Sequence, residues 1–135
     1  MHIRPFQPHD ETAVIALWQR SGLVVPRNDP ARDIALKRAW QPDLFLVGEE
    51  DGRVVASVMA GYEGHRGWIN YLAVDPDARR RGLGRLMLSE AEEALRALGC
   101  PKINLQVRTS NDAVRAFYQR VGYAVDDVIS FGKRL

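Results

Sequence analysis

The sequence has little cysteine, no long apolar run and almost no excess of charge of either sign. Its 135 residues include a single cysteine, Cys100, so no disulfide can form within the chain and no zinc site can be built from cysteines. No stretch approaches the ~18 apolar residues that would span a membrane. The N-terminus, MHIRPFQPHD, lacks the apolar core of a signal peptide. These absences predict a cytoplasmic protein that binds no membrane.

The charge balance limits the classes of partner. Nineteen Lys and Arg against 17 Asp and Glu leave a net charge of +2, too small for a general polyanion binder, so basic residues can act only locally. A hydrophobic share of 46% and a charged share of 27% are ordinary for a globular protein. The length predicts one domain, residues 1–135.

Hydrophobic periodicity predicts the element order βααβββαβαββ. Helices are expected at 10–20, 30–40, 83–98 and 111–121, and strands at 2–7, on both sides of Asp51-Gly52, at 68–74, at 102–107 and twice within 123–135. Alternation along 68–74 predicts one face made of Trp68, Asn70, Leu72 and Val74, and another made of Ile69, Tyr71 and Ala73. The strand–helix–strand unit in the middle predicts a mixed α/β (α+β) sheet with helices on both faces.

The stretch AVDPDARRRGLGRL joins a predicted strand to a predicted helix through a glycine-containing loop. A helix start presents unpaired N–H groups and about half a positive charge. Glycines at 82 and 84 let a ligand approach the backbone, and a guanidinium can bind phosphate with two hydrogen bonds. Phosphate is the ligand that this segment favours.

The same stretch is open to other interpretations. A tight turn with solvated arginines fits the residues equally well without further context. Nucleic-acid binding would need a larger basic excess than +2. The dinucleotide fingerprint G-x-G-x-x-G is absent.

Two motifs resemble the GNAT superfamily of N-acetyltransferases. Arg79, Gly82 and Gly84 form R-x-x-G-x-G after a strand ending LAVDP, which resembles that superfamily's acyl-CoA-binding motif. QVRTSNDAVRAFYQRVGY resembles its asparagine-to-tyrosine segment, with Asn111 and Tyr118 seven residues apart. The whole chain is also similar to small bacterial YpeA-type acetyltransferases, around NDP, GYEGHRG, GCPKI and the terminal GKRL.

The resemblance implies a mostly antiparallel, twisted mixed sheet that uses acetyl-CoA as cosubstrate and no metal. It places acetyl-CoA between the strand ending at Val74 and the strand starting near Lys102. The implied cofactor-binding residues, several of them acting through backbone N–H groups, are Leu72, Ala73, Val74, Arg79, Arg80, Arg81, Gly82, Leu83, Gly84, Arg85, Asn111 and Tyr118.

The resemblance also implies catalytic roles in acyl transfer through a tetrahedral intermediate. The backbone N–H of Val74 would stabilise the oxyanion, and the Tyr118 hydroxyl would protonate the leaving thiolate. The glutamates that act as bases in relatives are missing: Gln106 stands at one such position, and Trp68 and Asn70 stand at the other. Glu63 is the first candidate for the general base and His65 the second, and a water held by Asn70 and Gln106 is a third possibility.

The leading hypothesis is N-acetyl transfer to a primary amine of a small molecule or peptide. The alternative is a non-catalytic acyl-CoA-binding module that senses CoA, and a nucleic-acid-binding domain is the third candidate. The acceptor is expected to contact residues 23–29 and the corner at Asp126-Asp127. A homodimer formed through the final strands is compatible with this fold.

Overall fold

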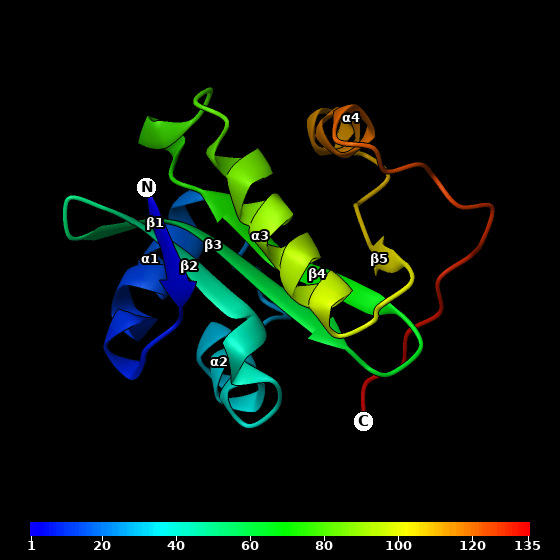
Figure 1. The fold of residues 1–135 in the computed structure, drawn as a ribbon, viewed down its shortest axis with the longest axis horizontal. Coiled ribbons are helices and arrows are strands. Elements are labelled where there is room, and N and C mark those ends of the chain that lie inside the picture. The colour runs from blue at the N-terminus through cyan, green and yellow to red at the C-terminus, as the bar shows by residue number, and fades with distance from the viewer. The chain divides into compact units, whose positions relative to one another are not determined.

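The chain forms two compact units, Met1–Leu105 and Gln106–Leu135, and the first contains one mixed sheet of five strands. The computed structural model describes all 135 residues (Figure 1). The helices and strands are β1 (His2–Pro5), α1 (Glu11–Arg20), α2 (Pro30–Arg38), β2 (Phe45–Glu50), β3 (Arg53–Tyr62), β4 (Gly67–Val74), α3 (Leu83–Ala97), β5 (Ile103–Leu105) and α4 (Asp112–Arg120). No helix is long and apolar enough to cross a membrane.

The sheet order is β1-β2-β3-β4-β5, antiparallel except for the parallel pair β4–β5. The β2–β3 turn holds Asp51 and Gly52 at φ 51° and 76°, the left-handed pair that a two-residue hairpin requires. Helix α3 connects the parallel strands β4 and β5 as a crossover. The mixed sheet and the strand–helix–strand unit are therefore confirmed.

Helix α2 begins where the sequence predicts a cap. Asp29 has an extended backbone and its carboxylate accepts a hydrogen bond of 3.1 Å from the N–H of Arg32. Pro30 fills the first helical position, where no N–H is needed. The helix ends at Arg38, two residues before the predicted end at Trp40.

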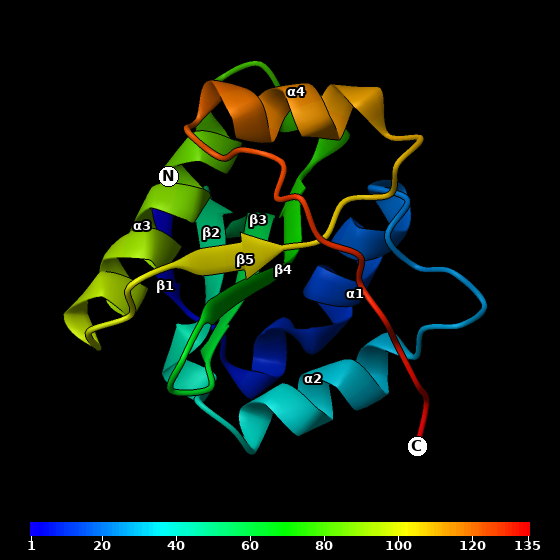
Figure 2. The same cartoon turned by 90° about the vertical axis from the view of Figure 1, so that its right-hand side faces the viewer.

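Helices cover both faces of the sheet, as predicted. Figures 1 and 2 show α3 on one face and α1 and α2 on the other. Beneath α1 and α2 lies an apolar cluster of Phe6, Val14, Leu17, Trp18, Ile34, Phe45, Val47, Met59 and Ala73. Under α3, the buried side chains include Leu83, Met87, Leu88, Ala91 and Leu95. Burial of these two clusters is the main source of stability for this unit.

The predicted faces of β4 are wrong because the strand contains a bulge. Ser57 pairs with Ala73 but Met59 pairs with Asn70, so two residues of β4 lie opposite one residue of β3. A Cβ on Gly67 would lie 3.1 Å from Leu95 of α3, and Ile69, two residues on, shares that face. Beyond the bulge, Tyr71 and Ala73 pack instead in the cluster beneath α1.

The other end of β4 confirms that the faces exchange. Val74 packs against Leu83 and Ala78, on the α3 side of the sheet. Ile69 and Val74 therefore share a face although the sequence places them an odd number of residues apart. Strict alternation could not predict this, because an inserted residue reverses every later position.

The unit Gln106–Leu135 contains α4 and no strand. Asn111 caps α4, since its side-chain oxygen accepts a 3.2 Å hydrogen bond from the N–H of Val114. The two short strands predicted within 123–135 are wrong, and the homodimer expected through them has no strand to form it. Asp126 and Asp127 interrupt the apolar alternation there, and strand propensity without a paired neighbour does not form a ladder.

We expect Leu17→Ala to lower the free energy of unfolding by about 2–5 kcal/mol, because it removes a side chain that is fully buried beneath α1. Leu36→Ala is the matched control: Leu36 lies in α2 with 61% of its surface exposed, so its loss should be within about 0.5 kcal/mol. Urea denaturation measures both values. Equal losses in the two variants would contradict this assignment of the core.

Candidate functional site

A buried aspartate fixes the chain where β4 ends. Asp75 is 4% exposed, and its carboxylate accepts hydrogen bonds from the N–H of Asp77 at 3.0 Å and from Nη2 of Arg20 at 2.7 Å. These bonds favour the charged form and hold the pKa of Asp75 below its ordinary value. The turn after β4 is thereby tied to the end of α1.

The glycine loop, residues 79–85, follows this turn and opens α3. Arg80 and Gly82 have φ values of 64° and 74°, so the backbone enters the left-handed region twice before the helix begins. No atom lies within 4 Å of a Cβ built on Gly82. The N–H groups of the first helical turn have no partner within the helix, and they carry its positive end. The loop therefore presents backbone donors beside open space.

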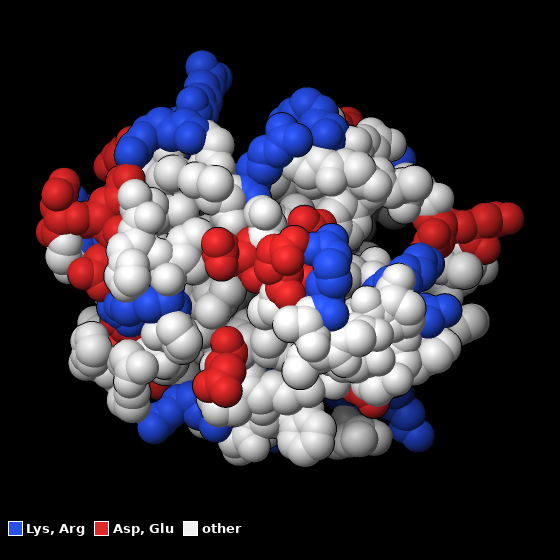
Figure 3. Space-filling model, in the orientation of Figure 1, with Lys and Arg blue, Asp and Glu red and all other residues white.

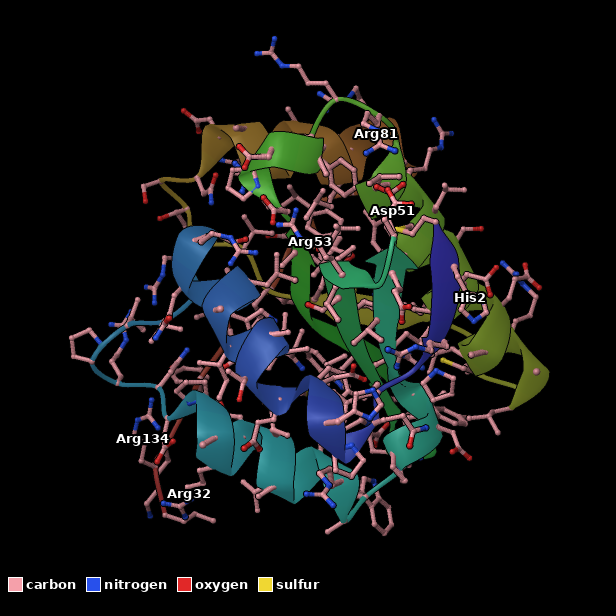
Figure 4. All side chains as sticks on the ribbon, turned by 90° about the vertical axis from the view of Figure 1, so that its left-hand side faces the viewer. His2, Arg32, Asp51, Arg53, Arg81 and Arg134 are labelled. Carbon is pink, nitrogen blue, oxygen red and sulfur yellow. The ribbon has the colours of Figure 1, made fainter.

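One loop arginine is already paired. The Arg81 guanidinium donates two hydrogen bonds, of 2.9 and 2.7 Å, to the two carboxylate oxygens of Glu50 at the end of β2. Figure 4 shows Arg81 beside the hairpin that carries Asp51 and Arg53. The ion pair lowers the pKa of Glu50. The Arg81 side chain thus braces the loop against the hairpin, which leaves its backbone N–H as the group available to a ligand.

The edge of β4 beyond Ile69 has no strand partner within Met1–Leu105. Strand β5 pairs only with Gly67–Ile69, and the N–H of Gly67 donates to the carbonyl of Lys102 at 2.9 Å. The N–H of Asp75 donates to Val55 of β3 at 2.8 Å. Because backbone groups alternate between the two edges, the N–H groups of Val74 and Leu72 point away from β3, to the unpaired edge.

The remaining β4 groups are partly engaged. The N–H of Ala73 points towards β3, opposite Ser57. The Arg79 Nε donates to the carbonyl of Val74 at 3.3 Å. The end of β4 and the glycine loop therefore form one continuous segment, in which the N–H groups of Leu72 and Val74 point to the edge that has no strand partner within Met1–Leu105.

Asn111 and Tyr118 belong to the other unit. The side-chain oxygen of Asn111 accepts the capping hydrogen bond at the start of α4. Tyr118 lies within the same helix. The Tyr118 ring makes edge contacts with Phe117 at 5.2 Å and Tyr123 at 5.6 Å between ring centroids. Burial raises the pKa of Tyr118 to about 12, so its hydroxyl stays protonated throughout the physiological range.

Comparison with known families shows the family to which this chain belongs. A sequence model described as the acetyltransferase (GNAT) family matches residues 12–123, which includes the β4 end, the glycine loop and α4. The chain belongs to the GNAT acetyltransferase family. It is thus an N-acetyltransferase, and membership of the family implies acetyl-CoA as the acetyl donor.

Relatives of this GNAT protein match it along its whole length. An acetyltransferase of Pectobacterium atrosepticum is 51% identical over 135 residues, covering 100% of this chain and 96% of the relative. Among solved structures, Ard1 from Thermoplasma volcanium is 28% identical with a TM-score of 0.83, over 93% of this chain and 83% of that one. PaiA N-acetyltransferase from Thermoplasma acidophilum, solved with coenzyme A, shares the fold at 18% identity and a TM-score of 0.80, over 95% and 92% of the two chains.

The candidate base of the GNAT protein is engaged in a turn. Glu63 lies exposed between β3 and β4, where its Oε1 accepts hydrogen bonds from the N–H of His65 at 2.6 Å and from the N–H of Arg66. The bond from Arg66 is the main cause of a lowered pKa for Glu63. Gln106, in the other unit, donates a hydrogen bond from Nε2 to Ser130 Oγ. The Glu63 carboxylate thus already stabilises local structure.

A polar network beside the bulge was missed by the sequence analysis. The Trp18 Nε1 donates to Ser57 Oγ at 2.9 Å, and Ser57 Oγ donates to the carbonyl of Tyr71, also at 2.9 Å. The Tyr71 hydroxyl donates to Asp33 Oδ2 at 2.6 Å. The one signal available in the sequence was Ser57 itself, a hydroxyl within the otherwise apolar run VVASVMAG.

The surface of the GNAT protein carries no large field of one sign on the face drawn in Figure 3. Lys and Arg side chains are interspersed there with Asp and Glu side chains. No group of three or more His, Cys, Asp or Glu side chains is placed to hold a metal ion. The arginines of the glycine loop act within a mixed surface, as the small net charge predicts.

We expect Asp75→Asn to lower the free energy of unfolding by about 1–3 kcal/mol at pH 7, since it removes a buried charge that Arg20 pairs with. The folded-state pKa of Asp75 is depressed, so its contribution is present above the unfolded value of ~3.9 and is lost as the pH falls through the folded pKa. The difference between parent and variant should therefore shrink below about pH 4. Urea denaturation across pH measures it, with the exposed Asp77→Asn as control. A pH-independent difference would contradict the charge argument.

Proposed function

We propose that this protein transfers an acetyl group from acetyl-CoA to a primary amine, as a GNAT enzyme of the YpeA type. One observation carries the proposal: two sets of backbone donors follow one another along the chain. The first is the N–H groups of Leu72 and Val74, on the edge of β4. The second is the N–H groups of the first turn of α3, which starts directly after Gly82. A long ligand matches these donors if it has an arm rich in amides, which can pair with β4, and a pyrophosphate next to that arm, which can bind the start of α3. The Thermoplasma acidophilum relative in the fold comparison was solved with coenzyme A.

The glycine loop would hold the pyrophosphate. Backbone donors of residues 80–85 carry the positive end of α3, and the open space at Gly82 admits phosphate oxygens. The exposed Arg79 and Arg80 add charge, while Arg81 contributes its N–H because its side chain pairs with Glu50. The pantetheine arm would extend the β4 edge by pairing with Leu72 and Val74.

Acetyl-CoA supplies an activated acetyl thioester. As the amine attacks its carbonyl, negative charge develops on the oxygen, and the Val74 N–H is the donor that would stabilise it. The Tyr118 phenol is protonated at neutral pH and can donate a hydrogen bond to the leaving thiolate, and its raised pKa makes full proton transfer to the thiolate less favourable than from an ordinary tyrosine. The family resemblance supports Asn111 as a further cofactor-binding residue.

The proposed acceptor is an amine, and a base must take a proton from its nitrogen for the acetyl transfer to be completed. Glu63 remains the proposed base, although accepting a proton would weaken two turn hydrogen bonds. An α-amine with pKa near 8 would require less help than a lysine side chain near 10.4. Residues 23–29, between α1 and α2, would contact a small-molecule or peptide acceptor, together with the Asp126-Asp127 corner.

We expect acetyl-CoA at 100 times its Kd to raise the melting temperature of the parent by several degrees, since it adds about 2.7 kcal/mol. Gly82→Asp should abolish the shift, because an aspartate tolerates the left-handed conformation but places a negative charge against the pyrophosphate. Gly52→Asp is the matched control: it has a similar φ of 76° and open space around its Cβ, and lies in the β2–β3 turn. The shift should survive there. No shift in the parent would overturn the proposed cofactor site.

Tyr118→Phe should slow acetyl transfer at least tenfold while leaving acetyl-CoA affinity unchanged, because it removes the proposed donor to the thiolate and nothing from the phosphate site. Release of CoA thiol over a panel of amines gives the rate, and calorimetry gives the affinity. Tyr123→Phe is the control, since its ring contacts Tyr118 and has no proposed role. A fully active Tyr118→Phe would remove Tyr118 as the acid. Parent binding without transfer to any amine would favour the CoA-sensing alternative.

A further inference from the structure

We propose that the Ser57 hydroxyl is a positioning residue that holds the β4 bulge and so aims the Val74 N–H at the acyl group. The inference rests on the proposed function, because the oxyanion role of Val74 belongs to it. Ser57 lies in β3, is completely buried, and matches no motif of the chain. It acts on the site through the backbone of Tyr71.

The direction of hydrogen bonding through Ser57 is determined by its neighbours. An indole N–H can only donate, so Trp18 occupies a lone pair of the serine oxygen. The single Ser57 proton is then free for the Tyr71 carbonyl, 2.9 Å away. Trp18 also stacks on the Tyr71 ring, with centroids 3.7 Å apart and planes inclined by 11°. Trp18 of α1 and Ser57 of β3 thus both hold Tyr71 in place.

Tyr71 needs this support because its backbone is strained. Its φ of 51° lies in the left-handed region, which is unfavourable for a bulky residue without a local constraint. The Ser57 bond gives the displaced carbonyl of Tyr71 a partner inside the protein. Its ring and hydroxyl are held by Trp18 and Asp33.

The alternative to the bulge is a regular ladder between β3 and β4. In that register Tyr71 and Ala73 would present their N–H groups to the unpaired edge, in continuation of Gly67 and Ile69, while Val74 would donate to β3. The bulge therefore decides which amides face a ligand. Ser57 is the buried hydroxyl whose bond exists only when Tyr71 adopts the bulged conformation.

The test compares two variants that each remove one bond of the same hydroxyl. Ser57→Ala removes the partner of the Tyr71 carbonyl, whereas Trp18→Phe removes the indole donor and leaves the Ser57 bond to Tyr71. Amide hydrogen exchange is measured on the ligand-free protein. In the parent and in Trp18→Phe, Val74 should exchange at least tenfold faster than Ala73. In Ser57→Ala, that ratio should fall below about threefold or reverse.

A second measurement adds acetyl-CoA as the probe and monitors its binding through the NMR amide resonances of Val74 and Gly84. Both resonances should shift in the parent and in Trp18→Phe. In Ser57→Ala, Gly84 should still respond while the Val74 response falls at least threefold, a split that general destabilisation would not produce. If Ser57→Ala does not fold, the isosteric pair Ser57→Thr and Ser57→Val replaces it, with the Val74 response retained only in Ser57→Thr.

The outcomes separate this inference from the proposed function. A parent in which neither Gly84 nor Val74 responds to acetyl-CoA overturns the proposed function and the inference with it. A Gly84 response without a Val74 response in the parent overturns the proposed oxyanion role of Val74 and this inference with it, and leaves the proposed pyrophosphate site standing. Identical exchange ratios and Val74 responses in Ser57→Ala and the parent overturn the inference alone, as would equal losses in Ser57→Ala and Trp18→Phe.

Discussion

The bulge in β4 is the constraint on which the candidate site depends. Before it, Gly67 faces α3 and donates its N–H towards β5. After it, Tyr71 and Ala73 face α1, and Leu72 and Val74 present the N–H groups of the unpaired edge. One extra residue reverses two things for every later residue of β4: the face of the sheet that its side chain occupies and the edge to which its N–H points. Both alternate with a period of two. The strand can therefore pack its first half under α3, pair with β5, and still offer backbone donors directly before the glycine loop.

The bulge carries a cost that its surroundings offset. A non-glycine residue in the left-handed region costs on the order of 1–3 kcal/mol. A glycine in place of Tyr71 would avoid that strain but would lose the stack on Trp18 and the hydrogen bond to Asp33. A side chain is therefore more useful here than conformational freedom, since its ring and hydroxyl join the bulge to α1 and α2. The same logic applies to the loop, where the Arg81–Glu50 ion pair joins it to the β2–β3 hairpin.

Much of this organisation could be predicted from the sequence, and the failures share a physical cause. Periodicity, the Asp29 cap and the Asp51-Gly52 turn are local signals, and the elements they indicate are present. The bulge was missed because nothing in WINYLAV marks a break in the period of two, and the choice of register depends on contacts with α1 and β3. The pairing of Arg81 with Glu50 joins residues 31 apart, which no local pattern reveals. The final strands failed because a strand exists only with a partner, and strand propensity in 123–135 does not supply one.

The hydrogen bonds that Glu63 accepts in its turn limit how well it could take a proton from the acceptor amine. A carboxylate that accepts two backbone N–H bonds in a turn is stabilised as the anion, so it gains little by taking a proton from an ammonium. With Glu63 as a weak base, the proposed reaction would depend mainly on the fraction of the acceptor that is already neutral. At pH 7.5, an amine of pKa near 8 is about one-quarter neutral, whereas one of pKa near 10.4 is about one-thousandth neutral, a difference of roughly two hundredfold. With Val74 as the proposed oxyanion donor and with the Glu63 carboxylate engaged in its turn, the proposed site would be suited to α-amines, whereas a lysine side chain would need its ammonium desolvated before it could react at a similar rate.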